Sequence, residues 1–139
     1  MGQTESAGRP KVLLIEDDAS FAAYLSERLH QIGYEVEWQA DGLRGLEQIR
    51  RAAADVIVID LALPGLDGLS LLDKLKADDA WPSIPVVILT GRFSSADVER
   101  ATVLGVADYV AKPINEVVFF GRLAELAGAG RRSASPILF

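Results

Sequence analysis

The sequence predicts a single α/β domain built on a parallel sheet, and three observations support this fold class. Short aliphatic runs typical of strands alternate five times with segments whose apolar residues recur at helical spacing. The chain has 139 residues, enough for one domain with a core, and no interior linker divides it. Hydrophobic residues make up 50% and charged residues 24%, typical of a folded globular protein. Because strands alternating with helices form βαβ units, helices are expected on both faces of one sheet.

The first half of the chain contains two strand–helix pairs. KVLLIEDD, residues 11–18, is an aliphatic strand that ends in acids, and the helix of residues 19–33 stops at a glycine. YEVEW, residues 34–38, alternates apolar and acidic residues and predicts a half-buried strand, followed by an amphipathic helix at 41–52. The apolar residues expected to face the core are Phe21, Leu25, Leu29, Ile32, Tyr34, Val36, Trp38, Leu43, Leu46 and Ile49.

The second half begins with DVIVID, residues 55–60, whose β-branched run predicts a strand buried on both faces. That strand ends on a carboxylate, which is costly to bury without a partner. The remaining expected elements are a helix through Leu69, Leu72 and Leu75, a strand at 84–90, a serine-capped helix at 94–105, a strand at 106–112 and an asparagine-capped helix at 115–128. Residues 10–128 are expected to form the domain, with tails at 1–9 and 129–139.

Composition narrows the classes of function. The chain has no cysteine, so neither a disulfide framework nor a thiolate metal site is expected. The net charge of −6 argues against direct nucleic-acid binding. No apolar run approaches the roughly 18 residues of a membrane span, and the first residues do not resemble a secretory signal. We therefore expect a cytoplasmic protein that binds no membrane.

Polar residues follow four of the predicted strands. They are Glu16 and Asp17, then Asp60, then Thr90, then Lys112. The carboxyl ends of parallel strands meet at one edge of a sheet, and ligands of open α/β sheets bind there. Three converging carboxylates repel one another unless a cation lies among them. Because the available ligands are oxygens, the pattern predicts a site for a hard divalent ion such as Mg²⁺.

This residue set suits phosphoryl transfer. A carboxylate can attack phosphorus and form an aspartyl-phosphate, and the transfer needs alignment and charge neutralisation more than covalent help. Asp60, on the central strand, is the predicted nucleophile, and Glu16 and Asp17 are the predicted metal ligands. Lys112 would supply a positive charge and Thr90 a hydroxyl donor. A buried strand would then direct its carboxylate into a cation site, which offsets the cost of burial.

Four segments together resemble the response-regulator receiver domain of two-component signalling. VLLIEDD, VIDLALPGLDG, VVILTG and DYVAKP occur in the family's order and spacing, over about residues 11–127. The resemblance implies a flavodoxin-like doubly wound five-stranded parallel sheet of order 2-1-3-4-5, with a cis bond before Pro113. It implies Mg²⁺ or Mn²⁺ bound by Glu16, Asp17, Asp60 and the backbone carbonyl of Ala62. It also implies that Lys112 binds the phosphate, and that Thr90 and Tyr109 are the switch residues.

The resemblance also implies a function. A histidine kinase or histidine phosphotransfer protein would phosphorylate Asp60, in a domain that catalyses its own phosphorylation and dephosphorylation but has no free substrate. The surface formed by residues 94–105, 106–112 and 115–128 would then change its preference for a downstream protein partner or output domain. The chain itself is expected to be a monomer or a weak homodimer.

Two positions depart from the family's common pattern. Ala62 stands where a larger residue is usual, and Arg92 is larger and more charged than most residues at its position. Both flank the phosphate in the family, so both are predicted to modulate its lifetime. Haloacid-dehalogenase-type phosphatases and toprim-type nucleases need a second aspartate at position 62 and are disfavoured. A phosphorylation-independent adaptor with the same fold remains open, as does a receiver fragment of a larger multidomain regulator or hybrid kinase.

The C-terminal tail ends in four apolar residues, Pro136 to Phe139. They are predicted to pack near Phe119 and Phe120, since a helix does not easily bury two adjacent aromatic residues on one stripe. The alternative is a loose chain end, which is usual for short termini.

Overall fold

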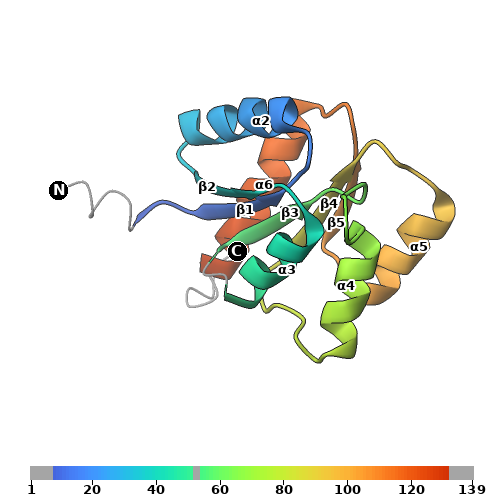
Figure 1. The fold of residues 1–139 in the computed structure, drawn as a ribbon. Coiled ribbons are helices and arrows are strands. Elements are labelled where there is room, and N and C mark those ends of the chain that lie inside the picture. The colour runs from blue at the N-terminus through green and yellow to red at the C-terminus, as the bar shows by residue number, and fades with distance from the viewer. Residues whose placement is uncertain (1–7, 52–53, 132–139) are drawn as a thin grey trace.

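The computed structural model describes residues 8–51 and 54–131. Five parallel strands form one sheet in the order β2-β1-β3-β4-β5, with helices on both of its faces (Figure 1). The predicted fold class and the strand order implied by the family resemblance are therefore confirmed. The peptide bond between Lys112 and Pro113 is cis, as the resemblance also implied. Within the described part of the chain, we find no helix with the length and apolar character needed to cross a membrane.

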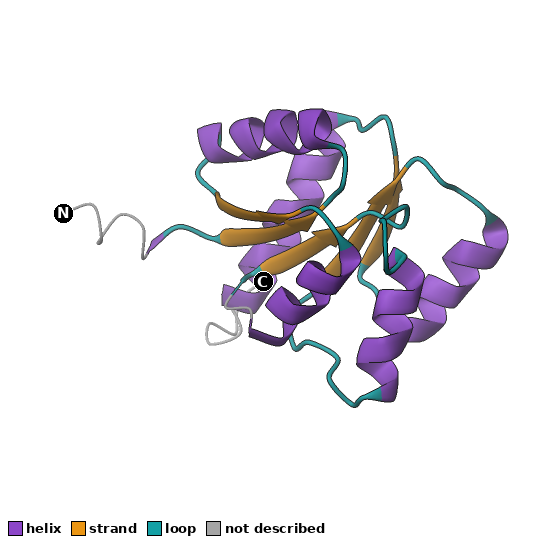
Figure 2. Cartoon of the chain, in the orientation of Figure 1, coloured by secondary structure: helices purple, strands orange, loops and turns teal. Residues whose placement is uncertain are grey.

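Between residues 11 and 131, the described part of the chain has ten elements in strict alternation (Figures 1 and 2). The strands are β1 (Lys11–Ile15), β2 (Glu35–Gln39), β3 (Val56–Ile59), β4 (Val86–Thr90) and β5 (Asp108–Ala111). The helices are α2 (Ala19–Gln31), α3 (Gly42–Arg51), α4 (Gly68–Ala77), α5 (Ser95–Leu104) and α6 (Glu116–Arg131). The predicted domain ends at residue 128, whereas α6 continues to Arg131.

Two apolar clusters hold the helices to the sheet. On one face, alternate strand residues such as Leu13 and Ile57 pack with α3, α4 and α5. On the other face, Val12, Val58 and their neighbours pack with α2 and α6. All four residues of β3 are 0% exposed, because this central strand contributes side chains to both clusters. Burial on both faces explains the unbroken β-branched run of that strand.

The helix boundaries agree with the capping signals in the sequence. Asp18 caps α2 by accepting a hydrogen bond from the Phe21 N–H at 3.1 Å. The hydroxyl of Ser94 accepts one from the Asp97 N–H at 3.1 Å, at the start of α5. At the end of that helix, Gly105 adopts a φ of 101°, a left-handed conformation that favours glycine. The two N-caps fix where the loops after β1 and β4 end and their helices begin.

Three residues predicted to face the core are exposed. Leu43 is 63% exposed, Ile32 is 50% exposed and Trp38 is 41% exposed. The inner face of α3 is formed by Gly42, Gly45, Leu46 and Ile49, and Leu43 lies off this face; Gly45 packs directly on Ile15. Ile32 lies at the C-cap of α2, where the helix has already ended. Trp38 lies near the open end of edge strand β2, and its indole reaches across to the backbone of Glu16.

Phe119 and Phe120, on which the C-terminal tail is predicted to pack, expose less apolar surface than expected. Phe119 is 1% exposed and Phe120 is half-buried, and both pack against the cluster formed by α2, α6 and the sheet. Much of both rings is therefore already covered within this cluster. Residues 136–139, on which the prediction rests, lie outside the described residues.

Gly42 offers a test of the packing beneath the loop that follows β3. A Cβ atom built at Gly42 would collide with the backbone oxygen of Leu66, so the loop or the helix would have to move. We expect Gly42→Ala to lower the free energy of unfolding by about 1–3 kcal/mol, as overpacking commonly does. Chemical denaturation measures this change. The control is Gly121→Ala in α6, where a Cβ meets no atom within 4 Å and stability should be unchanged or higher. Equal stability of the two variants would contradict the packing argument.

Candidate functional site

The polar residues predicted at the site lie together at the carboxyl edge of the sheet. Glu16 follows β1, Asp60 follows β3 and Lys112 follows β5, while Thr90 is the last residue of β4. The backbone ladder continues through these positions, since the Lys112 N–H donates to the Thr90 carbonyl at 2.9 Å. The parallel register of the sheet therefore positions four chemically different side chains at one edge.

Lys112 joins the two buried carboxylates. Its Nζ lies 2.8 Å from Glu16 Oε1 and 3.2 Å from Asp60 Oδ2. Glu16 is 1% exposed and Asp60 is 5% exposed, so solvent scarcely screens these pairs. The ammonium group also lies 4.3 Å from the centre of the Phe21 ring, a cation–π contact. One partly buried cation thus pairs with two buried carboxylates.

Asp17 adds a third carboxylate at the exposed side of this pair. One oxygen from each of Glu16, Asp17 and Asp60 lies within 4.8 Å of the others. Lys112 balances only part of their combined negative charge. The oxygen donors and the excess negative charge fit a hard divalent cation. Because Asp17 is exposed, such a cation could enter the site from solvent. The three predicted carboxylate ligands are therefore brought together, while their roles as ligands, and that of the Ala62 carbonyl, stay predictions.

The electrostatics of the site reflect burial and pairing. Burial raises the pKa of Glu16, and the nearby Asp60 adds to that rise against the opposing effects of Lys112 and of the Asp18 N–H. For Lys112, burial acts to lower the pKa, but the bonds and charges of Glu16 and Asp60 outweigh it and raise the pKa. The raised pKa keeps the lysine charged at neutral pH.

One hydrogen bond orients the Asp60 carboxylate, and another holds the backbone at Glu16. The Ala62 N–H donates to Asp60 Oδ1 at 3.2 Å, which fixes one carboxylate oxygen. Trp38 Nε1 donates to the backbone carbonyl of Glu16 at 2.6 Å, a contact that the sequence analysis missed. The alternating pattern of β2 indicated burial for Trp38, and no local signal showed that it reaches across to β1.

Thr90 and Tyr109 are joined through one residue, Arg92. Thr90 is 0% exposed, and its Oγ1 accepts a hydrogen bond from the Arg92 N–H at 3.1 Å. The hydroxyl of Tyr109 donates to the Arg92 carbonyl at 2.7 Å. The Tyr109 ring also packs edge-on against Phe93, with 5.3 Å between ring centres. The two predicted switch residues therefore contact the same stretch of loop after β4.

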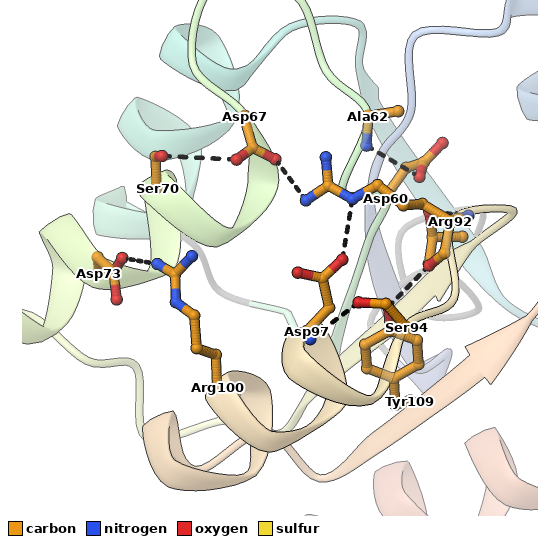
Figure 3. A network of polar contacts seen from close by, with 11 residues as sticks. Asp60, Ala62, Asp67, Ser70, Asp73, Arg92, Ser94, Asp97, Arg100 and Tyr109 are labelled. Atoms are coloured by element: carbon orange, nitrogen blue, oxygen red, sulfur yellow. Dashed lines mark hydrogen bonds and ion pairs between the residues drawn. The ribbon is translucent and has the colours of Figure 1, made fainter.

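The side chain of Arg92 lies between two carboxylates on neighbouring helices (Figure 3). Its Nε lies 3.1 Å from Asp97 Oδ2, and its terminal nitrogen lies 3.3 Å from Asp67 Oδ1. The sequence marked Arg92 as unusual but gave no signal for these partners. Asp67 is 25 positions away in the chain, so only the fold brings the two residues together.

The sequence is similar to that of a known family and of regulatory proteins from other organisms. The family described as response regulator receiver domain matches residues 12–124. The transcriptional activator protein IrlR of Burkholderia pseudomallei (strain 1026b) is 33% identical over 128 residues, covering 92% of this chain and 55% of that protein. The chain thus spans about half the length of the curated relatives it matches.

Solved structures agree in fold. A receiver domain protein (CheY-like) from Methanospirillum hungatei JF-1 is 25% identical with a TM-score of 0.82, covering 91% of this chain and 99% of that one. The receiver domain of sensor histidine kinase PA1611 from Pseudomonas aeruginosa PAO1 is 29% identical with a TM-score of 0.76. The match covers 87% of this chain and 99% of that one. That structure has a magnesium ion coordinated in its active site cleft. With the matched family and the convergent acidic site, this chain belongs to the response regulator receiver domain family.

Proposed function

We propose that this domain is a signalling switch in which Asp60 accepts a phosphoryl group from a phosphohistidine. The donor would be a histidine kinase or a histidine phosphotransfer protein. The observation that carries the proposal is the buried Asp60 carboxylate, held by Lys112 on one oxygen and by the Ala62 N–H on the other. A carboxylate aligned in this way, beside two further acids, fits a phosphoacceptor better than a structural ion pair.

The side chains divide the work of transfer. One oxygen of Asp60 forms the new bond to phosphorus while the bond from phosphorus to the donor imidazole breaks, and the imidazole nitrogen keeps that electron pair. Lys112 lies beside the attacking carboxylate and would neutralise charge on the phosphoryl oxygens. Mg²⁺ or Mn²⁺, held by Glu16, Asp17, Asp60 and the carbonyl of Ala62, would neutralise further charge on the transferred group.

The residues also count against rival functions of the same site. Position 62 is alanine, so the loop after β3 lacks the second carboxylate that a dehalogenase-type phosphatase would use as general acid. An adaptor that needs no phosphorylation would not require the alignment of Asp60 with Lys112. Incubation with Mg²⁺ and phosphoramidate, followed by intact-mass measurement, separates the two functions. Gain of one phosphoryl group supports the switch, and an unchanged mass supports the adaptor.

Thr90 and Tyr109 would carry the signal from the phosphoryl group to the surface. Thr90 would donate to a phosphoryl oxygen, and the loop that it shares with Tyr109 through Arg92 would move with it. The surface formed by α5, β5 and α6 would then favour a different partner or output domain. Such a shift occurs only to the extent that phosphate binds one arrangement better than the other. Ala62 and Arg92 border this site and would modulate the lifetime of the phosphorylated form.

Thr90→Ala separates signal transmission from chemistry. We expect the variant to be phosphorylated, because Asp60, Lys112 and the acidic cluster remain in place. Its amide spectrum over residues 92–112 should change little on phosphorylation, since the hydroxyl that would bond to phosphate is gone. Heteronuclear NMR of wild type and variant, each before and after phosphorylation, measures this difference. Shifts in the variant as large as those in wild type would place the coupling on other residues.

The relatives also suggest where the domain works and what it controls. The curated relative IrlR is named a transcriptional activator, and it extends well beyond the region that this chain matches. We propose that the domain works in the cytoplasm, receives its phosphoryl group from a kinase, and controls a downstream protein or an attached output domain. As a separate chain it would be a monomer or a weak homodimer.

A further inference from the structure

Arg92 contacts both predicted switch residues and two helices at once. Its backbone N–H and carbonyl bond to the hydroxyls of Thr90 and Tyr109, at 3.1 Å and 2.7 Å. Its guanidinium pairs with Asp67 at the start of α4 and with Asp97 in the first turn of α5 (Figure 3). We call Arg92, Asp67 and Asp97 the Arg92 latch. Any shift of the Arg92 backbone therefore changes the surroundings of Thr90 and Tyr109 together.

The latch holds Thr90 toward the loop. In this structure the Thr90 hydroxyl accepts a hydrogen bond from the Arg92 backbone. A Thr90 that moved to bond a phosphoryl group on Asp60 would have to break that bond or carry the Arg92 peptide with it. The two ion pairs of the guanidinium oppose such a movement, because they fix the same residue to both helices.

Asp67 lies at a position that offers its side chain an alternative partner, the first turn of α4. It occupies the N-cap position of α4, where an aspartate commonly accepts a bond from its own helix. Here its side chain makes no capping bond; one oxygen instead faces Arg92, and the other accepts a long bond from the Ser70 hydroxyl. If Arg92 moves away, Asp67 can rotate to cap α4. Opening the latch therefore replaces one interaction of Asp67 with another.

We propose that Arg92, held by Asp67 and Asp97, is a positioning residue that keeps the Thr90 hydroxyl bonded to the loop after β4 and thereby opposes activation of the domain. The proposal rests on the proposed function, since it assumes that Asp60 is the phosphoacceptor. The energetic scale is modest. The Arg92 side chain is 44% exposed and the pairs are screened by solvent, so the latch should alter affinity for a phosphoryl mimic roughly two- to tenfold.

Because Arg92 is positively charged, the direction in which its removal changes the affinity for a phosphoryl mimic distinguishes two roles. If the guanidinium served mainly to attract phosphate, its removal would weaken anion binding. If it serves mainly as a latch, removal strengthens binding although a positive charge is lost. Arg92→Gln therefore separates the two roles by direction. Asp97→Asn opens the latch while the arginine stays, and should also strengthen binding.

The matched control is a second ion pair between the same two helices. Arg100 of α5 pairs with Asp73 of α4 and carries the same charge as Arg92. Among the described residues, no hydrogen bond or ion pair joins Arg100 to Thr90 or Tyr109, and Figure 3 shows Arg100 further along the helices. Arg100→Gln removes one positive charge and one tie between α4 and α5. Its affinity for the mimic should stay within about twofold of wild type, as is usual for exposed pairs.

The experiment titrates the full chain with beryllium fluoride in the presence of Mg²⁺, a stable mimic of an aspartyl-phosphate, and follows the amide signals of Thr90 and Lys112. We expect Arg92→Gln and Asp97→Asn to bind roughly two- to tenfold more tightly than wild type. Arg92→Lys should be intermediate, because an ammonium cannot form the forked pair. The double variant should bind no more tightly than Arg92→Gln alone, since both changes open one latch.

Each outcome has a distinct meaning. Equal or weaker binding by Arg92→Gln, with normal binding by wild type, overturns the latch and leaves the phosphoacceptor function intact. Tighter binding by Arg100→Gln to the same degree also overturns it, because a general loosening of α4 from α5 would then suffice. Wild type that fails to bind the mimic overturns the proposed function, and the latch with it.

Discussion

Asp60→Asn is expected to abolish phosphorylation while preserving the fold. The amide keeps the size of the carboxylate, and its oxygen can still accept from the Ala62 N–H. Lys112 keeps its closer partner, Glu16, at 2.8 Å. The amide oxygen is a far weaker nucleophile than a carboxylate and cannot form an acyl-phosphate. Intact mass after incubation with Mg²⁺ and phosphoramidate should show one added phosphoryl group in wild type and none in the variant.

The control for this result is Asp73→Asn. Asp73 is an exposed aspartate whose partner is Arg100, so it should leave phosphorylation unchanged. Melting temperature shows whether each variant is folded. Because Asp60 is one of three carboxylates within 4.8 Å, its neutralisation should leave stability unchanged or raise it. A mass gain in Asp60→Asn would move the phosphoacceptor elsewhere, with Asp17 the next candidate.

The elements of the fold could be predicted because their signals are local. Apolar spacing marked α4 through Leu69, Leu72 and Leu75, and all three are buried. The β-branched run of β3 indicated burial on both faces, which the structure confirms. The convergence of Glu16, Asp60, Thr90 and Lys112 also followed from sequence, since strand ends in a parallel sheet meet at one edge. Residues aligned by the sheet itself are therefore the most predictable part of the site.

The errors arise where packing depends on distant residues. In α3 the apolar pattern favoured Leu43 as an inner residue, but the close approach of Ile15 requires glycine at position 45 and turns Leu43 outward. Trp38 follows the alternation of β2, yet its indole reaches over the strand edge to the Glu16 carbonyl. Spacing alone gives no weight to a glycine or to a contact between strands. The partners of Arg92 were hidden for the same reason.

Asp17 differs from the other acids of the cluster because it is exposed, and it is therefore the best residue for testing metal ligation separately from folding. A ligand that binds only the folded state stabilises it, by about 1.4 kcal/mol when its concentration is ten times Kd. We expect Mg²⁺ to raise the melting temperature of wild type by a few degrees. Asp17→Asn should respond much less, since it loses a direct ligand. Without Mg²⁺ its melting temperature should equal or exceed that of wild type, because repulsion with Glu16 and Asp60 is relieved.

Asp18→Asn provides the adjacent control for Asp17→Asn. The Asp18 side chain caps α2 through the Phe21 N–H at 3.1 Å and lies outside the acidic cluster. Asparagine is an equally good cap, so this variant should keep both its stability and its response to Mg²⁺. Each substitution removes one negative charge, and the two positions are adjacent. A general loss of attraction for cations would therefore weaken the response of the melting temperature to Mg²⁺ equally in both variants. A weaker response in Asp17→Asn alone means direct ligation, and equal responses in all three proteins would rule it out.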